Sequence, residues 1–185
     1  WYRGTRWPPC PPGCPAHTDA RRYVTLAGEA NWREGLELLR RTYPFVASLG
    51  RVCPAPCEKS CSRGFTGPEP IAIRKLKRTY SDWEETLPIE DQFSYEEYCC
   101  SKPLNGKRVA IVGGGPAGYQ SAMLLRAWGF ECTIFECRDI PGGFLTLGIP
   151  KYRLPRRVVN REMERIHSLD GIHMVLSTEI GVDVP

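Results

Sequence analysis

The 185-residue chain lacks the sequence features that would place it in a membrane, outside the cell or on nucleic acid. It has no run of about 18 apolar residues, so no membrane-spanning helix is expected. No charged segment followed by an apolar run opens the chain, so no secretory signal is expected either. The 25 Lys and Arg and 21 Asp and Glu residues are mixed along the sequence, without the clustered basic stripe typical of nucleic-acid binding. These absences predict a soluble, cytoplasmic protein.

The nine cysteines are a high count, for which a secreted disulfide scaffold is one explanation. Five of them fall instead into two tight groups, Cys10-x3-Cys14 and Cys53-Pro-x2-Cys57-x3-Cys61. Thiolates at such short spacing suit iron–sulfur clusters or zinc. Zinc stays an alternative on spacing alone, but five cysteines exceed one tetrahedral zinc or one four-cysteine cluster.

The cysteine groups lie in a segment, residues 1–85, that the sequence indicates is helical. Residues 1–15 are rich in Pro and Gly, which predicts a loop. Two helices follow, the first capped by Thr18 and the second by Asn31. Beyond the cysteine-rich turn, apolar spacing predicts a third helix over 71–83 with a basic face that we expect to be solvated. That face consists of Arg74, Lys75, Lys77 and Arg78.

The hydrophobic pattern of the sequence changes after residues 86–106. This stretch is acidic and has no sustained hydrophobic period, so we interpret it as a linker. Arg108–Val112 is a short continuous apolar run, which predicts a strand buried on both faces and hence a parallel sheet. Further elements are expected as helix 117–128, strand 132–136, helix 157–168 and strand 172–176. Residues 107–185 therefore form an incomplete α/β domain of the dinucleotide-binding type.

A glycine-rich turn, Gly113-Gly114-Gly115-Pro116-Ala117-Gly118, follows the first expected strand directly and precedes a helix. Gly113 permits the tight turn, Gly115 lets the backbone approach a pyrophosphate, and Gly118 allows the helix to pack close to the strand. Glu136 lies at the end of the second expected strand. In dinucleotide-binding folds an acidic side chain at this position accepts a hydrogen bond from a ribose hydroxyl. The complete order of strand, turn, helix, strand and acid predicts dinucleotide binding.

The same fingerprint serves flavin and nicotinamide cofactors. Pro141-Gly142-Gly143 follows the acid closely, and this glycine pair would let a second backbone segment approach the pyrophosphate, which favours FAD. A flavin also favours a cluster over zinc at the cysteines, because zinc has no redox chemistry. The candidate cofactor-binding residues are Gly113, Gly115, Pro116, Ala117, Gly118, Glu136, Cys137, Gly142, Gly143, Gly148 and Ile149. No Ser/His/Asp or paired-carboxylate arrangement is present, so no catalytic residue is assigned.

Specific motifs occur along nearly the whole chain: Pro9-Cys10-Pro-Pro-Gly-Cys14, Gly50-Arg51-Val52-Cys53-Pro54, Cys57-Glu58, the glycine-rich turn, Gly142-Gly143 and Gly148-Ile149-Pro150-Lys-Tyr-Arg153-Leu154-Pro155. As a set they resemble the small subunit of bacterial glutamate synthase, an FAD and iron–sulfur NAD(P)H oxidoreductase family. The module is also found in dihydropyrimidine dehydrogenase, in the large subunit of ferredoxin:NADP transhydrogenase, and in flavoprotein partners of dissimilatory sulfite reductase and formate dehydrogenases. The resemblance implies an all-α iron–sulfur domain followed by a partial Rossmann-like FAD-binding domain.

The resemblance also implies the cofactors and their ligands. Cys14, Cys53 and Cys57 are expected to ligate the [4Fe–4S] cluster nearer the flavin, and Cys10 and Cys61 a second one, so one or two clusters are expected with FAD. NAD(P)H is expected as substrate at a site outside this segment, and a larger catalytic or electron-accepting subunit as partner.

The chain departs from the family pattern in three places. The further cysteines of the outer cluster should lie before Trp1. The non-cysteine fourth ligand of the inner cluster falls near Lys77, which cannot ligate iron. A cysteine that some members carry just before Gly-Arg-Val-Cys is Leu49 here.

The expected function is a flavin-dependent electron relay from NAD(P)H through the clusters to a partner enzyme. The alternative is an electron-inert docking or assembly domain of a larger oxidoreductase complex, favoured by the absence of a second G-x-G-x-x-G. Because a three-stranded sheet leaves an edge unpaired, we expect these residues to belong to a longer polypeptide or to be ordered within an assembly.

Overall fold

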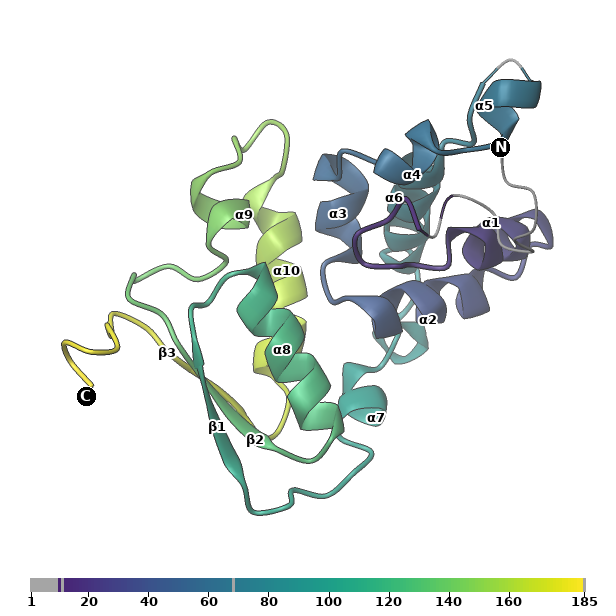
Figure 1. The fold of residues 1–185 in the computed structure, drawn as a ribbon. Helices are drawn as coiled ribbons and strands as arrows, with labels where there is room; N and C mark the ends of the chain where they lie inside the picture. Colours follow the sequence, from purple (N-terminus) through teal and green to yellow (C-terminus); the bar gives the residue numbers. More distant parts are fainter. Residues whose placement is uncertain (1–9, 11, 68, 185) are drawn as a thin grey trace. The chain divides into compact units, whose positions relative to one another are not determined.

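The computed structural model describes residues 10, 12–67 and 69–184, and the chain divides into two compact units, Trp1–Phe93 and Ser94–Pro185 (Figure 1). The described part of the first unit consists of helices and loops, and the second contains a parallel sheet with helices. The predicted order of a helical domain and a partial α/β domain is confirmed. None of the described helices is long and apolar enough to cross a membrane.

The first unit contains six α-helices and a 3₁₀ turn in its described part: α1 (Ala20–Gly28), α2 (Trp32–Thr42), α3 (Val46–Val52), α4 (Pro56–Lys59), α5 (Arg63–Thr66), α6 (Ile73–Glu84) and η1 (Ile89–Asp91). Asn31 caps α2 as predicted, with its side chain accepting the N–H of Glu34 at 3.4 Å. The cap of α1 is Asp19 rather than Thr18, because the Asp19 carboxylate accepts the N–H of Arg22 at 3.0 Å. The cysteine-rich turn is therefore built from three short helices, α3 to α5.

Helix α6 is the centre of the first unit because two glycines let it approach its neighbours. A Cβ on Gly35 of α2 would overlap the ring and hydroxyl of Tyr80, and a Cβ on Gly50 of α3 would lie 2.7 Å from Cα of Arg78. The Tyr80 hydroxyl donates to the carbonyl of Tyr23 at 2.6 Å and joins α6 to α1. Around these contacts lies one apolar core, formed by Ala20, Tyr23, Leu36, Leu39, Tyr43, Val46, Cys57, Ile73 and Tyr80.

The prediction that the basic face of α6 is solvated is only partly right. Lys75 and Arg78 are exposed, but Lys77 is buried at 8% exposure. Lys77 belongs to the face that also carries Ile73 and Tyr80, because positions three and four apart share one side of a helix.

The second unit begins within the stretch 86–106 that the sequence indicates as a linker. This stretch contains η1 and the short helix α7 (Tyr95–Cys99), and the compact units divide between Phe93 and Ser94. The remaining elements are β1 (Arg108–Val112), α8 (Pro116–Ala127), β2 (Glu131–Phe135), α9 (Phe144–Leu147), α10 (Arg156–His167) and β3 (Ile172–Val175).

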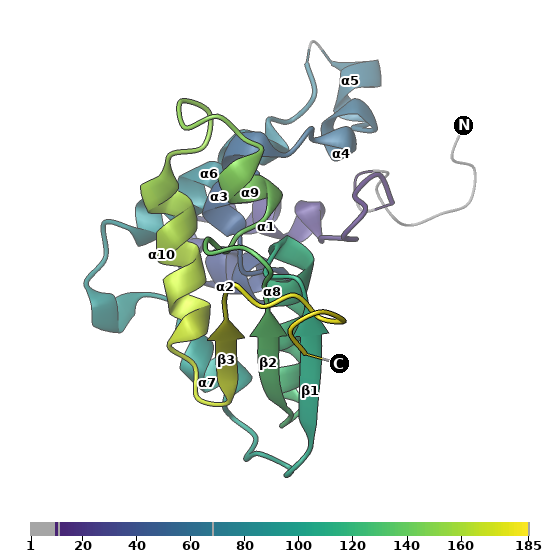
Figure 2. The same ribbon diagram turned by 90° about the vertical axis from the view of Figure 1, so that its left-hand side faces the viewer.

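The three strands form one parallel sheet in the order β1-β2-β3 (Figure 2). Val112 is aligned with Phe135, and Ile134 with Met174. The carboxyl ends of β1 and β2 thus lie side by side, so the turns that follow them meet at one edge of the sheet.

The expectation that β1 is buried on both faces is wrong for the described structure. Alternate residues of β1 are exposed, and Val112 is 70% exposed. Helices α8 and α10 lie on the same face of the sheet, where Cys132 and Ile134 of β2 are fully buried (Figure 1). A strand is buried on both sides only where layers cover both faces, and the described helices cover one.

Candidate functional site

The glycine-rich turn between β1 and α8 has the backbone geometry of a close strand–helix connection. Gly113 has a φ of +102°, a region that favours glycine, and its N–H donates to the carbonyl of Phe135 at 2.8 Å. A Cβ on Gly118 would overlap the carbonyl oxygen of Gly113. The third glycine of the motif therefore lets α8 begin directly against the end of β1, with Pro116 in its first turn.

A second glycine segment lies against this turn. The N–H of Gly142 donates to the carbonyl of Gly114 at 2.7 Å, and a Cβ on Gly143 would lie 3.0 Å from Cα of Gly115. Gly142 and Gly143 both have positive φ, +98° and +50°. Two backbones without side chains thus meet at the N-terminus of α8, where helix N–H groups lack partners within the helix and attract negative charge.

Glu136 binds the turn from the end of β2. Its Oε2 accepts the N–H of Gly114 at 2.8 Å, and its Oε1 accepts the N–H of Arg138 at 3.0 Å and the thiol of Cys137 at 3.4 Å. Burial opposes ionisation of this carboxyl, but the hydrogen bonds from Arg138, Gly114 and Cys137 outweigh it and hold the pKa of Glu136 below its usual value. The structure therefore places an ionised acid beside the glycines, and the exposed Cys137 next to it.

Two further residues of this site carry no motif by which they could be predicted. The hydroxyl of Thr146 in α9 is buried without a hydrogen-bond partner among the described residues, and it lies beside Gly142. The guanidinium of Arg156 donates to the carbonyls of Leu145 and Ile149 at 3.1 and 3.0 Å and so holds the chain after α9. Gly148 and Ile149, predicted as cofactor contacts, lie at the far end of α9 from the glycine pair.

The structure divides the five clustered cysteines of the first unit into two groups. The first, called the three-thiol group here, consists of Cys14, Cys53 and Cys57. Burial raises the pKa of Cys57 to about 11, and the charges of Cys14 and Cys53 add to this increase. Burial also opposes ionisation of Cys14, but its hydrogen bonds with Thr18 and with the backbone of Ala16, together with the charge of Lys77, bring its pKa below the usual value.

Polar groups hold the loops of the three-thiol group in place. The N–H of Ala55 donates to Sγ of Cys53 at 3.4 Å. The guanidinium of Arg74 donates to the carbonyl of Cys53 at 3.0 Å, and the carboxylate of Glu58 accepts the N–H of Arg74 at 2.7 Å. Arg74 and Glu58 thereby fix the loop of Cys53 to the start of α6.

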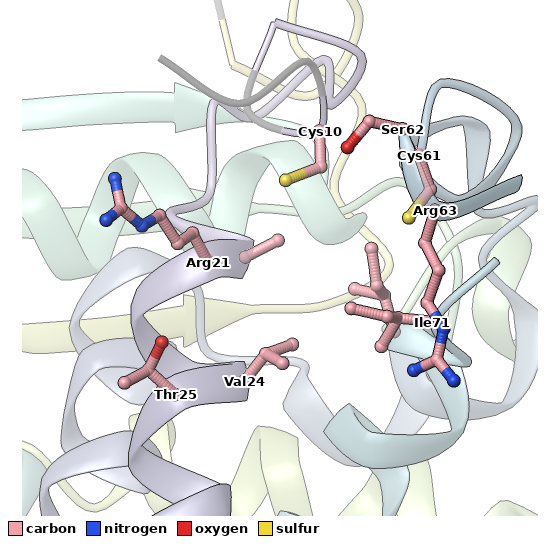
Figure 3. Close-up of a pocket in the computed structure, with 10 residues that line it drawn as sticks. Cys10, Arg21, Val24, Thr25, Cys61, Ser62, Arg63 and Ile71 are labelled. Atoms are coloured by element: carbon pink, nitrogen blue, oxygen red, sulfur yellow. The ribbon is translucent and has the colours of Figure 1, made fainter. Parts of the chain in front are cut away.

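The second group is the pair Cys10 and Cys61, which lines a cavity of about 220 Å³ (Figure 3). Val24 and Ile71 supply part of its apolar wall, and Arg21 also lines it. Burial raises the pKa of Cys10, and the charge of Cys61 adds to this increase. The cavity is thus a pocket with two neighbouring thiols.

The five clustered cysteines are donors of the kind that iron–sulfur clusters use. Among the described residues, no three His, Cys, Asp or Glu side chains are close enough together to hold one metal ion. All nine cysteines are free thiols, so no disulfide competes for the sulfurs. A four-iron cluster spaces its thiolates farther apart than a single ion does, and cysteine thiolates are its usual ligands.

Each of the two units matches a known protein family. Residues 5–88 match the family described as dihydropyrimidine dehydrogenase domain II, 4Fe-4S cluster, and residues 111–173 match the NAD(P)-binding Rossmann-like domain. Relatives include the NADP(+)-dependent formate dehydrogenase subunit beta of Moorella thermoacetica (39% identity over 95% of this chain and 27% of that protein). The NADPH-Fe(3+) oxidoreductase subunit beta of Geobacter sulfurreducens is 37% identical over 95% of this chain and 25% of its own. The glutamate synthase [NADPH] small chain of Bacillus subtilis is 39% identical over 93% of this chain and 33% of its own. The chain therefore spans about a quarter to a third of the length of these relatives.

Proposed function

Because this chain belongs to the family of iron–sulfur and dinucleotide-binding oxidoreductase subunits that includes the glutamate synthase small chain, we propose that it is an electron-transfer subunit. It would pass electrons between NAD(P)H, FAD and [4Fe–4S] clusters to a larger catalytic or electron-accepting partner. The relatives are named as beta subunits or as a small chain, which supports a partner of this kind. The free cysteines suit the reducing cytoplasm.

FAD at the glycine-rich turn is the central part of this proposal. It is supported by the contact between Gly115 and Gly143, where two glycine backbones leave room for a pyrophosphate at the start of α8. The ionised Glu136 has lone pairs beyond its two backbone hydrogen bonds, so it can accept a ribose hydroxyl as well. The unpartnered Thr146 hydroxyl is a further polar group of this cradle.

When bound, the flavin would accept a hydride and release electrons singly, and the clusters would carry single electrons onward. The residues of the second unit bind and orient the dinucleotide. In the first unit, the three-thiol group and the Cys10–Cys61 pair would hold the clusters. Cys57 and Cys61 are buried and the other three thiols are half-buried, so the surrounding protein would limit access of water and dioxygen to the sulfurs.

Cofactor analysis of anaerobically purified protein tests the proposal. We expect flavin absorbance with a broad iron–sulfur shoulder, FAD as the released nucleotide, and several iron and acid-labile sulfide atoms per chain. The Cys14→Ser variant should lose iron, whereas Cys100→Ser, which changes a thiol outside both groups, should retain it. A colourless protein containing zinc alone would refute the relay and favour a docking domain, and a bound nicotinamide dinucleotide in place of FAD would refute the flavin assignment.

A further inference from the structure

Residues 142–155 run from the glycine pair through α9 to the start of α10, and we call this segment the α9 strap. Hydrogen bonds within the strap close its backbone. The N–H of Leu147 donates to the carbonyl of Gly143 at 2.9 Å, and the N–H of Ile149 donates to the carbonyl of Phe144 at 3.1 Å. These bonds give the strap a defined conformation between its two ends.

Arg156 joins three carbonyl groups of the strap with one side chain. Its Nη1 donates to the carbonyls of Leu145 and Leu154 at 3.1 and 3.4 Å, and its Nη2 donates to the carbonyl of Ile149 at 3.0 Å. Carbonyls in the last turn of a helix lack partners within the helix, and an arginine side chain can satisfy them. Leu145 and Leu154 are buried, so the guanidinium holds the strap where it packs into the unit.

The position of Arg156 in α10 does not favour that helix. Arg156 is the first residue of α10, at the end where the helix dipole favours negative charge, and the first turn contains no acidic residue to offset it. A cation is therefore unfavourable for α10 at this position. The hydrogen bonds to the strap account for an arginine here.

The beginning of the strap lies against the glycine-rich turn. The N–H of Gly142 donates to the carbonyl of Gly114 at 2.7 Å, and a Cβ on Gly143 would lie 3.0 Å from Cα of Gly115. The strap thus supplies one side of the space at the N-terminus of α8, in which the pyrophosphate is proposed to lie.

We infer that Arg156 is a positioning residue of the dinucleotide site: it closes the α9 strap and thereby holds Gly142 and Gly143 against the glycine-rich turn. This inference rests on the proposed function, because FAD is the ligand proposed there. Among the described residues, all three hydrogen bonds of Arg156 go to the strap, so its effect on the ligand is indirect. A segment already held in its bound conformation loses less conformational entropy when the ligand binds, and closure of the strap therefore favours binding.

Titration of the flavin-depleted full chain with FAD tests this role. In Arg156→Met the dissociation constant should rise by about tenfold, because the strap is no longer held in place before the ligand binds. Arg156→Lys should restore part of the affinity, since an ammonium can donate to the same carbonyls but lacks the planar fork of a guanidinium.

Arg126→Met is the matched control for stability. The guanidinium of Arg126 also donates to backbone carbonyls, those of Asp170 and Lys102 at 2.6 and 3.0 Å, but it lies in the last turn of α8, away from the glycines. This variant should lower the melting temperature of the chain and keep the FAD affinity of the parent. Arg156→Lys and Arg126→Lys make the same comparison if the methionine variants do not fold.

Hydrogen exchange of the ligand-free chain tests the coupling without any flavin. The Gly142 amide, which donates to Gly114 at the far end of the strap, should exchange severalfold faster in Arg156→Met than in the parent. In Arg126→Met its exchange rate should be unchanged.

The outcomes separate the inference from the proposed function. If the parent binds FAD and Arg156→Met binds it equally well, or Arg126→Met loses as much affinity, the inference is overturned and the proposed function stands. An unchanged exchange rate of the Gly142 amide in Arg156→Met would also overturn the inference. A parent that binds no FAD would overturn the proposed flavin site and, with it, the role of Arg156 in holding FAD.

Discussion

The carboxylate of Glu136 accepts the N–H of Gly114 at 2.8 Å, and so the end of β2 is tied to the turn that follows β1. The acid that the sequence suggests for a ribose therefore also fixes the glycine-rich turn. These hydrogen bonds hold the pKa of Glu136 below its usual value, so the carboxylate is ionised at neutral pH. In that state it accepts from the N–H groups of both Gly114 and Arg138. One side chain thus links the architecture of the turn to its proposed ligand.

Replacing Glu136 by Ala should weaken dinucleotide binding because a ribose acceptor and the support of Gly114 are both removed. We expect a loss of about 1–3 kcal/mol in FAD affinity, measured by titration of the flavin-depleted protein. Glu131→Ala removes a carboxylate from the opposite end of the same strand, where it contacts the exposed His173, and should bind FAD as the parent does. Equal affinities in the two variants would argue against a role for Glu136.

The glycines of the turn should differ sharply in their tolerance of a methyl group. A Cβ on Gly118 would overlap the carbonyl oxygen of Gly113, whereas a Cβ on Gly115 meets Cα of Gly143 at 3.9 Å, an ordinary contact. Gly118→Ala should therefore lower the melting temperature of the ligand-free protein, and Gly115→Ala should leave it nearly unchanged.

The larger Gly115→Val change should fold but lose FAD, because its γ-methyl groups fill the space next to the glycine pair. Calorimetry and flavin content measure these two effects separately. Full flavin occupancy in Gly115→Val would contradict the assignment of this turn to the pyrophosphate.

Elements with a complete local pattern could be predicted from the sequence. The strands 108–112 and 132–136 and the helix 117–128 agree with β1, β2 and α8 to within about one residue, because an apolar run, a glycine turn and a capping glycine mark their ends. Gly113 and Gly118, which the turn requires, could be predicted because the glycine motif lies directly between a strand pattern and a helix pattern.

Features that depend on tertiary contacts could not be predicted in this way. Helices α3 to α5 have between four and seven residues, which is too short for a helical period to be recognised. The burial of Lys77 was missed because a charge among other charges indicates a solvated face, and only the packing of α6 shows that it turns inward. Thr146 carries no motif, and its unpartnered hydroxyl follows from the fold around Gly142.

His167 should make the stability of the second unit depend on pH. The Tyr119 hydroxyl lies 2.6 Å from its Nε2 and joins α8 to α10. Burial, only partly opposed by the charge of Glu164, lowers the pKa of His167 from 6.5. A lowered pKa in the folded state means that the unfolded state binds the proton first, so this stability is present above pH 6.5 and is lost as the pH falls toward the folded pKa.

We therefore expect the melting temperature to fall between about pH 7.5 and about pH 5.5, and the fall to be smaller in His167→Gln. His173→Gln changes an exposed histidine of the same unit and should keep the pH dependence of the parent. An identical pH profile in His167→Gln and the parent would exclude His167 as its source.

The buried ion pair of Arg40 and Glu84 should make the first unit sensitive to the loss of one of its two charges. Both side chains are almost completely inaccessible, and the guanidinium donates to Glu84 Oε2 and to the carbonyl of Pro44. The second carboxylate oxygen, Oε1, accepts the N–H of Phe93 at 3.1 Å. Removal of the negative charge takes away the carboxylate that accepts from a buried guanidinium, which costs far more than the loss of an exposed pair.

Glu84→Gln should therefore lower the free energy of unfolding by about 3–5 kcal/mol, measured by urea denaturation. Glu37→Gln, which removes the charge from an exposed pair with Arg41, should cost less than about 1 kcal/mol. The double variant Arg40→Met, Glu84→Leu replaces both charges by apolar groups and should be less destabilised than Glu84→Gln, because no buried charge remains unpaired. A double variant that is as unstable as Glu84→Gln would mean that the hydrogen bonds to Pro44 and Phe93, and not the ion pair, hold this part of the unit together.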